Sequence, residues 1–360
     1  MNSYANIDKN LVVNKTIGDV DVVWHHVRQE PFSLYGLYNP LTEPIFRRLP
    51  KSVGDATSKG VSLLCEMSAG GRVRFSTDSP YIAIRARFRM VDRHPLIAMI
   101  SSNGFDLYTD GEFGSRYLGV YRMTYDIEDS YEQILYVHST ALRSYTINFP
   151  LRAVVESLEI GLKPDAVLKE ARPYRDLDPI VVYGSSIVHG ACASRPGNAY
   201  PAILSRSFNM DVVNLGFAGK AKGETVLAEW MATLPMSVFV CDFDHNTHNA
   251  QELEAAHYPL YETIRKQQPN VPYIMITRPN FSTCQDFKEN ILERREVVMR
   301  SYLRARETGD RNVYFIDGMS FFTEPHAYDF TADSVHPNDA GYIRMADSIG
   351  TVIRYILESE

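Results

Sequence analysis

The sequence lacks a long apolar run, an excess of basic residues and a recognisable export signal. No apolar stretch reaches the roughly 18 residues of a membrane-spanning helix, so we expect no membrane partner. The formal net charge of −7 argues against nucleic acid as a partner. The N-terminus, MNSYANIDKN, has no basic start followed by an apolar segment, which predicts no signal peptide in this chain. If a signal peptide has been cleaved from a longer precursor, we expect a periplasmic or secreted protein. Otherwise we expect a cytoplasmic protein.

Cysteine is scarce as well. The four cysteines do not follow the C-x-x-C spacings that are typical of zinc sites and redox pairs. They are Cys65, Cys192, Cys241 and Cys284, and two of them, Cys65 and Cys241, lie in apolar segments. We therefore expect buried free thiols, and we expect neither a metal nor an organic cofactor.

The residues that are present form two regions with different periodicity. Up to about residue 165, apolar and polar residues alternate as they do in half-buried strands. In YIAIRARFRM (81–90), isoleucine, alanine and phenylalanine alternate with arginine, and GRVRFST (71–77) shows the same pattern. Gly, Pro, Asn and Asp separate these runs, and no convincing amphipathic helix interrupts them. This region predicts an all-β domain, an antiparallel sandwich or jelly roll.

From about residue 178, short apolar strands alternate with segments of helical spacing. The strands are PIVVY, DVVNL, SVFVCDF, PYIMIT and NVYFID. The clearest helix is the last, with Ile343, Ala346, Ile349, Ile353 and Ile356 along one predicted face. Strand and helix alternating in this way predict a doubly wound α/β domain whose strands are all parallel.

A charged segment with three prolines, residues 163–179, separates the two regions. Its composition is typical of a linker, and 360 residues are enough for two domains. We therefore predict an N-terminal β-domain of residues 1–170 and a C-terminal α/β domain of residues 171–360. The oligomeric state is left open.

Polar side chains and glycines follow the predicted parallel strands directly. These positions are informative because ligands of such sheets bind beyond the carboxyl ends of the strands. Ser185 and Ser186 follow the first strand, a loop ending at Gly219 follows the second, and Asn246 follows the third. The segment DSVHP, with an aspartate and a histidine, comes after the fifth strand. Each element alone is common in loops, but together they predict one site.

The residue types suit nucleophilic catalysis. A serine hydroxyl such as that of Ser186 needs a base, and the imidazole of His336 suits that role near neutral pH. Asp333, in the same loop, can fix the orientation of the imidazole. The backbone N–H groups of Ser186 and Gly219 and the amide of Asn246 can form an oxyanion hole for the negative charge that develops on the substrate oxygen.

These blocks resemble those of the SGNH (GDSL-type) hydrolases, which are esterases built on a flavodoxin-like sheet. The resemblance covers about residues 178–360 and implies that Ser186 is the nucleophile, completed by Asp333 and His336, with Gly219 and Asn246 as oxyanion donors. In the first half, Gly104-Phe105-Asp106-Leu107-Tyr108 is similar to the Gly-x-Asp-Leu-Tyr motif of an N-terminal β-domain that precedes one group of these hydrolases. That group implies acyl-ester hydrolysis, often in bacteria that degrade polysaccharides.

The sequence departs from the family pattern at two positions. Ser185 replaces the aspartate of the Gly-Asp-Ser block, which in the family ties down the loop, so we expect a looser nucleophile turn. Asp244-His245-Asn246 stands where the family more often has Gly-x-Asn, and the side chain of Asp244 is expected to reshape the pocket floor.

Other polar residues near these blocks allow different interpretations. Asp242, Asp244, His245 and His248 are possible metal ligands, but their spacing favours a polar loop around Asn246. His189 is expected to face solvent or substrate, and Arg195 is expected at the surface. Two glycines around Asp106 suggest a β-turn with a buried aspartate.

The sequence thus predicts a two-domain serine esterase that hydrolyses a short acyl ester through an acyl-enzyme. An O-acetylated carbohydrate is the favoured substrate, on the resemblance alone. A non-catalytic carbohydrate-binding protein on the same fold remains an alternative, as do a lipase and an acyltransferase that passes the acyl group to a hydroxyl other than water. The lack of a long apolar lid segment argues against the lipase.

Overall fold

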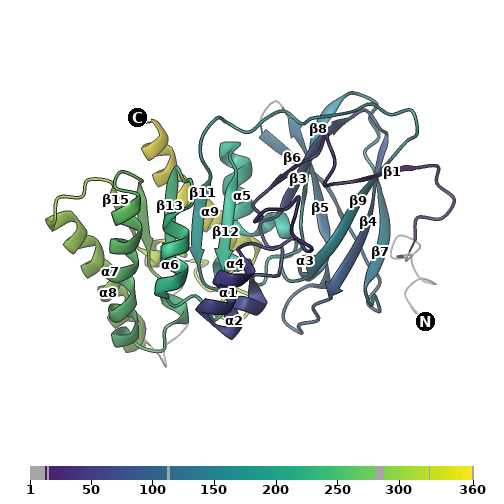
Figure 1. Ribbon diagram of the computed structural model, residues 1–360. Helices are drawn as coiled ribbons and strands as arrows, with labels where there is room; N and C mark the ends of the chain where they lie inside the picture. The colour runs from purple at the N-terminus through teal and green to yellow at the C-terminus, as the bar shows by residue number, and fades with distance from the viewer. Residues whose placement is uncertain (1–12, 14–15, 112–113, 280–287, 324, 359–360) are drawn as a thin grey trace.

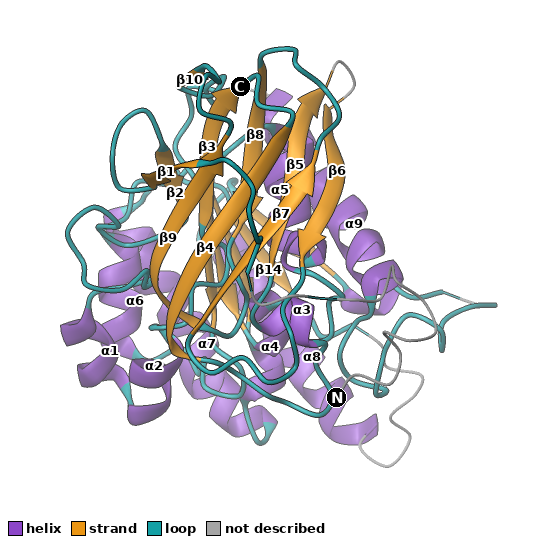
Figure 2. Cartoon of the chain, turned by 90° about the vertical axis from the view of Figure 1, so that its right-hand side faces the viewer, coloured by secondary structure: helices purple, strands orange, loops and turns teal. Residues whose placement is uncertain are grey.

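The computed structural model describes residues 13, 16–111, 114–279, 288–323 and 325–358. Antiparallel strands of the first half lie at one end of the molecule, and a sheet flanked by helices lies at the other (Figure 1). Turned by 90°, the strands of the first half stand in front of most of the helices (Figure 2).

The first half contains two antiparallel sheets that enclose one apolar core. One sheet has the order β1-β9-β4-β7, and the other has the order β10-β3-β8-β5-β6, with β2 paired to β3. The strands are β1 (Val23–His26), β2 (Ser33–Tyr35), β3 (Arg72–Thr77), β4 (Tyr81–Met90), β5 (Phe105–Gly111), β6 (Gly114–Tyr121), β7 (Ser130–Tyr136), β8 (Arg143–Asn148), β9 (Val154–Leu162) and β10 (Leu168–Lys169). The predicted β-sandwich is confirmed.

Alternation gave the inward faces of β3 and β4 correctly but did not reveal what covers the other face of β3. In β4 the apolar residues are buried and the arginines between them are exposed, as predicted. In β3 every residue is buried, and Arg72 and Arg74 are only 2% and 1% exposed. Arg72 donates hydrogen bonds to the carbonyl of Val212 (3.1 Å) and to Asp211 in the second half of the chain. The polar face of β3 therefore lies against the second half.

The first half also contains helices that the sequence patterns did not predict. They are α1 (Lys51–Thr57), α2 (Lys59–Leu64) and α3 (Met99–Ser102). The first two lie beside α6 (Thr225–Ala232) of the second half (Figure 1). Six buried residues of this region join the core of the second half, together with Phe217 and Leu227. They are Ile45, Leu49, Val61, Leu64, Cys65 and Met67. Residues 45–67 thus contribute to the core of the second half, except Phe46, which lies in the core of the first half.

The second half is a five-stranded parallel sheet with helices on both faces. Its order, β12-β11-β13-β14-β15, is that of flavodoxin-like folds, so the predicted fold class is confirmed. The strands are β11 (Ile180–Gly184), β12 (Val212–Gly216), β13 (Val238–Asp242), β14 (Tyr273–Ile276) and β15 (Val313–Ile316). The remaining helices are α4 (Ser186–His189), α5 (Tyr200–Phe208), α7 (Ala250–Gln267), α8 (Lys288–Glu307) and α9 (Asp339–Glu358). Within the described residues, no helix combines the length and apolar character needed to cross a membrane.

Each face of the sheet has its own apolar cluster. Residues of α6, α7 and α8 pack on one face, and residues of α4, α5 and α9 pack on the other. In α9 the predicted apolar face is wrong at one position, because Ile343 is 49% exposed and Tyr342 and Met345 are buried instead. Ile349, Ile353 and Ile356 are buried as predicted.

The predicted linker does not run free between the two halves. Its residues Leu168 and Lys169 form β10 and pair with β3. Further along, the ring of Tyr174 lies 4.1 Å from the guanidinium carbon of Arg74. The segment is therefore packed onto the first half, and the division at residue 170 stays a prediction.

The cysteines that can be described are free. Cys65 and Cys241 are buried, as expected, whereas Cys192 is only half-buried. Burial raises the pKa of the Cys65 thiol to about 11. Cys284 lies outside the described residues.

One buried histidine makes stability depend on pH. His257 in α7 is 1% exposed and stacks on Phe243, with ring centroids 5.6 Å apart. Burial lowers the pKa of His257 from 6.5 to about 4. Between these two values the unfolded chain is protonated at this position and the folded chain is not. The unfolded state therefore binds more protons, and the free energy of unfolding falls as the pH drops from 6.5 to 4.

We expect His257→Phe to remove this acid sensitivity. Between pH 6.5 and 4, the wild type should lose about 3 kcal/mol more of its unfolding free energy than the variant does. Urea unfolding at a series of pH values measures the difference. His326→Phe, at a side chain that is 71% exposed, is the control and should follow the wild type. Parallel pH profiles for the wild type and His257→Phe would contradict the assignment.

Candidate active site

Ser186 lies just past the carboxyl end of β11, the second strand in the order of the parallel sheet. β11 ends at Gly184, and Ser186 is the first residue of α4. A side chain on Gly184 could not be accommodated, because a Cβ there would lie 2.0 Å from the carbonyl oxygen of Asp242. The close approach of β11 and β13 therefore requires glycine directly before the two serines.

Ser185 holds the turn despite replacing the family aspartate. It is completely buried and is the N-cap of α4, where its hydroxyl accepts a hydrogen bond from the N–H of Ile187 (3.2 Å). Its own N–H donates to the carbonyl of Asp242 (3.0 Å). A serine hydroxyl thus supplies the capping acceptor that an aspartate would otherwise offer.

Ser186, His336 and Asp333 form a continuous hydrogen-bonded chain. The hydroxyl oxygen of Ser186 lies 2.9 Å from Nε2 of His336, and Nδ1 of His336 lies 2.7 Å from Oδ2 of Asp333. All three side chains are partly exposed. The histidine and the aspartate both precede α9, in a loop closed by a bridge between Thr331 and Pro337.

The Asp333 carboxylate is fixed by its own loop. Oδ1 accepts hydrogen bonds from the N–H groups of Val335 (3.1 Å) and His336 (2.7 Å). Burial acts to raise the pKa of Asp333, but hydrogen bonds from the backbone and ring of His336 outweigh it and lower the pKa below its usual value. The carboxylate is therefore ionised at neutral pH and can hold the imidazole with Nε2 towards Ser186.

Donor groups surround the same end of the sheet. Gly219 has a φ of 67°, in the left-handed region that glycine adopts without strain, and within the described residues its N–H has no hydrogen-bond partner. Asn246 ends the 3-10 turn Asp244–Asn246, and its Nδ2 donates to the carbonyl of Phe217 (3.1 Å). An amide carries two N–H groups, so one remains for a ligand.

A buried arginine from the first half anchors the glycine loop. Arg48 is 1% exposed and donates hydrogen bonds to the carbonyls of Asn214 (3.1 Å) and Gly216 (2.6 Å). It also donates to the carbonyls of Leu64 (2.6 Å) and Met67 (2.9 Å). Burial lowers the pKa of Arg48 to about 10, so it stays charged at neutral pH. No sequence pattern distinguished this arginine, because its partners are all backbone carbonyls, which the residue types do not reveal.

The polar residues after β13 mostly face the interior. Asp242 accepts a hydrogen bond from the hydroxyl of Tyr200 (3.1 Å), and Asp244 accepts one from the N–H of Arg278 (2.9 Å). Burial raises the pKa of both aspartates. Asp244 therefore anchors the backbone at Arg278, and its expected effect on the pocket floor stays a prediction.

The possible metal ligands of this segment do not gather in one place. Within the described residues, the one group of three potential ligands consists of Cys192, Asp333 and His336, whose ligand atoms lie within 4.8 Å of one another. Cys192 has a φ of 67°, and burial raises the pKa of its thiol to about 11. The sequence did not predict that Cys192 lies near His336, because the two residues belong to different loops.

The expectation that His189 faces solvent or substrate is wrong. His189 is 2% exposed, and its Nε2 lies 2.7 Å from the carbonyl of Leu151 in the first half. It is therefore an interior contact between the halves, and its burial lowers its pKa well below the usual value. The side chain of Arg195 is partly exposed, and its guanidinium carbon lies 4.0 Å from the ring centroid of Tyr117.

The Gly-x-Asp-Leu-Tyr motif connects the first half to the loop after α4. Asp106 is fully buried, but it lies in β5 and not in the predicted turn. Its carboxylate accepts hydrogen bonds from Asn148 (2.7 Å) and from the N–H of Gly197 (2.8 Å). Three residues before Gly197, the backbone N–H and the hydroxyl of Ser194 donate to Asp339, the first residue of α9. The motif thus holds a loop that also contacts the helix following His336.

Two family models match the chain, one for each half. Residues 177–354 match the GDSL-like lipase/acylhydrolase family, and residues 22–168 match the N-terminus of SGNH hydrolase-type esterases. The fold and the matched family together define a carboxylic ester hydrolase. The chain belongs to the SGNH (GDSL-type) hydrolases, in the group that carries the Gly-x-Asp-Leu-Tyr N-terminal domain. No curated protein matches the chain.

Solved structures resemble both halves at once. A GDSL-like lipase of Bacteroides ovatus is 29% identical, with a TM-score of 0.85 over 94% of this chain and 98% of its own. The salicylyl-acyltransferase SsfX3 of a tetracycline biosynthetic pathway is 19% identical, with a TM-score of 0.75 over 91% and 95%. The acetyl xylan esterase Est2A of the rumen bacterium Butyrivibrio proteoclasticus is 12% identical, with a TM-score of 0.56 over 94% and 99%. The last two show a shared fold alone.

Proposed function

We propose that the chain is a serine esterase in which Ser186 is the nucleophile, His336 the general base and Asp333 the residue that orients His336. The observation that carries the proposal is the chain of hydrogen bonds from Ser186 through His336 to Asp333, with distances of 2.9 Å and 2.7 Å. Its position at the carboxyl end of a parallel sheet is where ligands of such folds bind.

The proposed reaction proceeds in two acyl transfers. Nε2 of His336 takes the proton of Ser186 while the hydroxyl oxygen attacks the ester carbonyl, and the N–H groups of Ser186 and Gly219 and the amide of Asn246 donate to the oxyanion. His336 then gives the proton to the leaving alcohol, and an acyl-enzyme remains on Ser186. Water, deprotonated by His336, attacks this ester and releases the acid. The reaction as proposed requires no metal and no organic cofactor.

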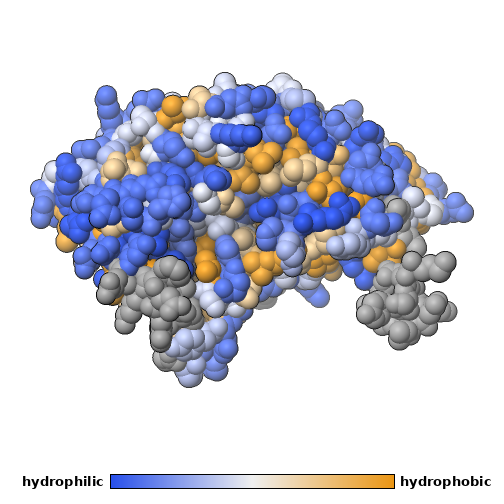
Figure 3. Space-filling model, turned by 90° about the horizontal axis from the view of Figure 1, so that it is seen from below, coloured by the Kyte–Doolittle hydropathy of each residue, from blue (hydrophilic) through white to orange (hydrophobic). Residues whose placement is uncertain are grey.

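We further propose that the substrate is a short acyl ester, with an O-acetylated carbohydrate favoured. Support comes from the acetyl xylan esterase that shares the fold over 94% of this chain. The face of the molecule seen from below (Figure 3) also fits a hydrated polymer better than a lipid. Seen from below, apolar patches are separated by hydrophilic residues across the face (Figure 3).

The test is hydrolysis of p-nitrophenyl acetate, butyrate and octanoate by the wild type, Ser186→Ala and Ser185→Ala. We expect acetate to be preferred, activity to disappear in Ser186→Ala, and Ser185→Ala to retain activity with a less stable turn. Full activity of Ser186→Ala would refute the nucleophile, and a preference for octanoate would refute the short-acyl substrate. An inactive wild type would favour a carbohydrate-binding protein.

An acyltransferase is the second candidate, because an acyltransferase shares the fold with a TM-score of 0.75. Transfer and hydrolysis pass through the same acyl-enzyme and differ only in the acceptor. Product analysis of p-nitrophenyl acetate turnover with an added sugar separates them. Free acetate as the dominant product supports the esterase, whereas acetylated sugar formed in its place supports the transferase.

Asn246 provides a separate prediction on the oxyanion hole. We expect Asn246→Ala to lower kcat by about 10²- to 10³-fold with a small change in KM, because the amide would bind the oxyanion more strongly than the ground-state carbonyl. His248→Ala, two residues on and exposed, is the matched control and should keep the wild-type kcat. A loss confined to KM in Asn246→Ala would assign the amide to substrate binding instead.

A further inference from the structure

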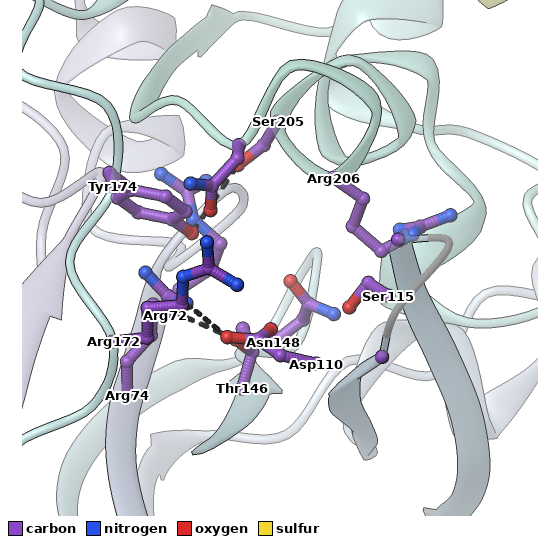
Figure 4. A pocket seen from close by; sticks show the side chains of 13 residues that line it. Arg72, Arg74, Asp110, Ser115, Thr146, Asn148, Arg172, Tyr174, Ser205 and Arg206 are labelled. Atoms are coloured by element: carbon purple, nitrogen blue, oxygen red, sulfur yellow. Dashed lines mark hydrogen bonds and ion pairs between the residues drawn. The ribbon is translucent and has the colours of Figure 1, made fainter. Parts of the chain in front are cut away.

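A cavity of about 220 Å³ lies between the two halves, away from Ser186. It is lined by β3, β5, β6 and β8 of the first half, by the segment containing Arg172 and Tyr174, and by the C-terminal end of α5. Figure 4 shows Arg72, Arg74, Arg172 and Tyr174 on one side of the cavity and Arg206 across from them.

The cavity and the candidate active site lie at opposite ends of the parallel sheet. Arg206 and Asn209 line the cavity, and the chain then enters β12 at Val212, which is the amino end of that strand. Gly219 and Ser186 follow the carboxyl ends of β12 and β11. A five-residue strand at about 3.3 Å per residue separates the two sites by roughly 16 Å. The cavity is therefore not part of the catalytic pocket.

The lining of the cavity is strongly cationic. It contains four arginines and a single acid, Asp110. Arg74 pairs with Asp110 (2.9 Å), and Arg72 pairs with Asp211 just outside the lining. Arg172 and Arg206 form no ion pair within the described part of the chain. Asp106, near Arg206, already accepts hydrogen bonds from Asn148 and Gly197. The Arg206 guanidinium donates hydrogen bonds to the carbonyls of Gly197 and Ala202 instead. Arg172 is therefore the lining arginine whose guanidinium has no acceptor within the described residues.

Two buried nitrogens at this cavity also lack acceptors. Nε of Arg72 and Nη1 of Arg74 are inaccessible to solvent and have no hydrogen-bond partner. Burying charged donors without acceptors is costly, and neighbouring guanidinium groups repel one another. An anion in the cavity would reduce this repulsion and offer an acceptor to the exposed guanidinium of Arg172.

We propose that the cavity is a binding site for a small polyhydroxylated anion, a sugar acid or a sugar phosphate. Guanidinium groups bind carboxylate and phosphate through paired N–H donors, which accounts for the anionic group. A water molecule occupies roughly 30 Å³, so the cavity has room for more than an inorganic oxyanion. Ser115, Ser205 and Asn209 add hydroxyl and amide groups to the lining that suit sugar hydroxyls.

Calorimetric titration of the full chain with galacturonate, glucose 6-phosphate, inorganic phosphate and glucose tests the proposal. The measurement does not depend on catalysis, and Ser186→Ala should bind as the wild type does. We expect saturable binding of at least one sugar anion. Inorganic phosphate should bind more weakly, and glucose should not bind measurably. The relative affinities of galacturonate and glucose 6-phosphate identify the favoured acidic group.

Arg172→Gln is the deciding variant. The Arg172 side chain is exposed and makes no hydrogen bond within the described residues, so the variant should fold normally. We expect binding of the sugar anion to weaken about tenfold or more, the loss typical of one charge-assisted hydrogen bond. Arg175→Gln removes the same charge three residues further on, at an exposed residue outside the lining, and should bind like the wild type. Undetectable binding at millimolar ligand, equal affinity for glucose or inorganic phosphate, or unchanged binding in Arg172→Gln would each overturn the proposal.

Discussion

Ser186→Ala and His336→Ala should each lower kcat for p-nitrophenyl acetate by about 10⁶-fold, and the double variant should be no worse than either single variant. The reason is the hydrogen bond between the Ser186 hydroxyl and Nε2 of His336 (2.9 Å). If the two residues act as one unit, losing the nucleophile makes the base useless, and losing the base leaves a hydroxyl that attacks poorly. Residual activity over the uncatalysed reaction would then come from binding and from the oxyanion donors.

A matched histidine provides the control for this prediction. His326 lies 3.2 Å from Asp329 and shares the three-residue spacing of Asp333 and His336, but its side chain is 71% exposed. His326→Ala should therefore keep the wild-type kcat. Thermal unfolding of every variant verifies that lost activity does not reflect lost structure. Losses that multiply in the double variant would mean that the two residues act independently, which is inconsistent with a shared proton transfer.

Arg48→Met should produce the largest loss of stability, about 4 kcal/mol or more in the free energy of unfolding. Methionine fills much of the same space but leaves four carbonyl oxygens, those of Leu64, Met67, Asn214 and Gly216, without their charged donor. One hydrogen bond to a charged group typically contributes about 1.5–3 kcal/mol to stability. Even if the backbone partly rearranges around the methionine, a large part of the unfolding free energy is therefore lost. Urea unfolding measures the change.

Arg48→Lys tests whether the positive charge alone is sufficient or whether the arrangement of the guanidinium donors is also needed. An ammonium group keeps the charge but cannot direct donors to carbonyls on both sides as the guanidinium fork does, so we expect an intermediate loss of stability. Arg87→Met, at a side chain that is 64% exposed, should stay close to the wild type. Because Arg48 holds the carbonyl of Gly216, kcat of Arg48→Lys should fall more than its KM rises. Wild-type stability in Arg48→Met would show that water or a rearranged backbone replaces the guanidinium.

The sequence was most informative where the signal is local. Gly-Ser-Ser after an apolar strand and Asp-x-x-His before the last helix indicated Ser186, Asp333 and His336, and the fold brings all three within hydrogen-bond distance. The end of a strand can be recognised from the residues next to it, and the carboxyl ends of parallel strands all lie at the same edge of the sheet. For this reason, residues about 150 positions apart could be grouped without a structure.

The sequence was least informative where a polar side chain packs against a distant part of the chain. Arg72 and Arg74 alternate with apolar residues like the exposed arginines of β4, yet both are buried, Arg72 against the second half and Arg74 under the ring of Tyr174. His189 and Arg48 likewise look like surface residues, and both are buried between the halves. Alternation identifies two faces of a strand, but only tertiary contacts determine whether the polar face meets water.

The packing of residues 45–67 limits how this protein can be divided or recombined. This segment precedes most of the β-sandwich in the chain but belongs to the apolar core beneath α6. A gene fragment that starts at the predicted boundary would encode an α/β half with part of its interior missing. Exchange of the β-sandwich between related enzymes would succeed only if this inserted segment were left with its native partner. The halves are thus interleaved along the chain, and a cut at residue 170 would separate the α/β half from part of its own core.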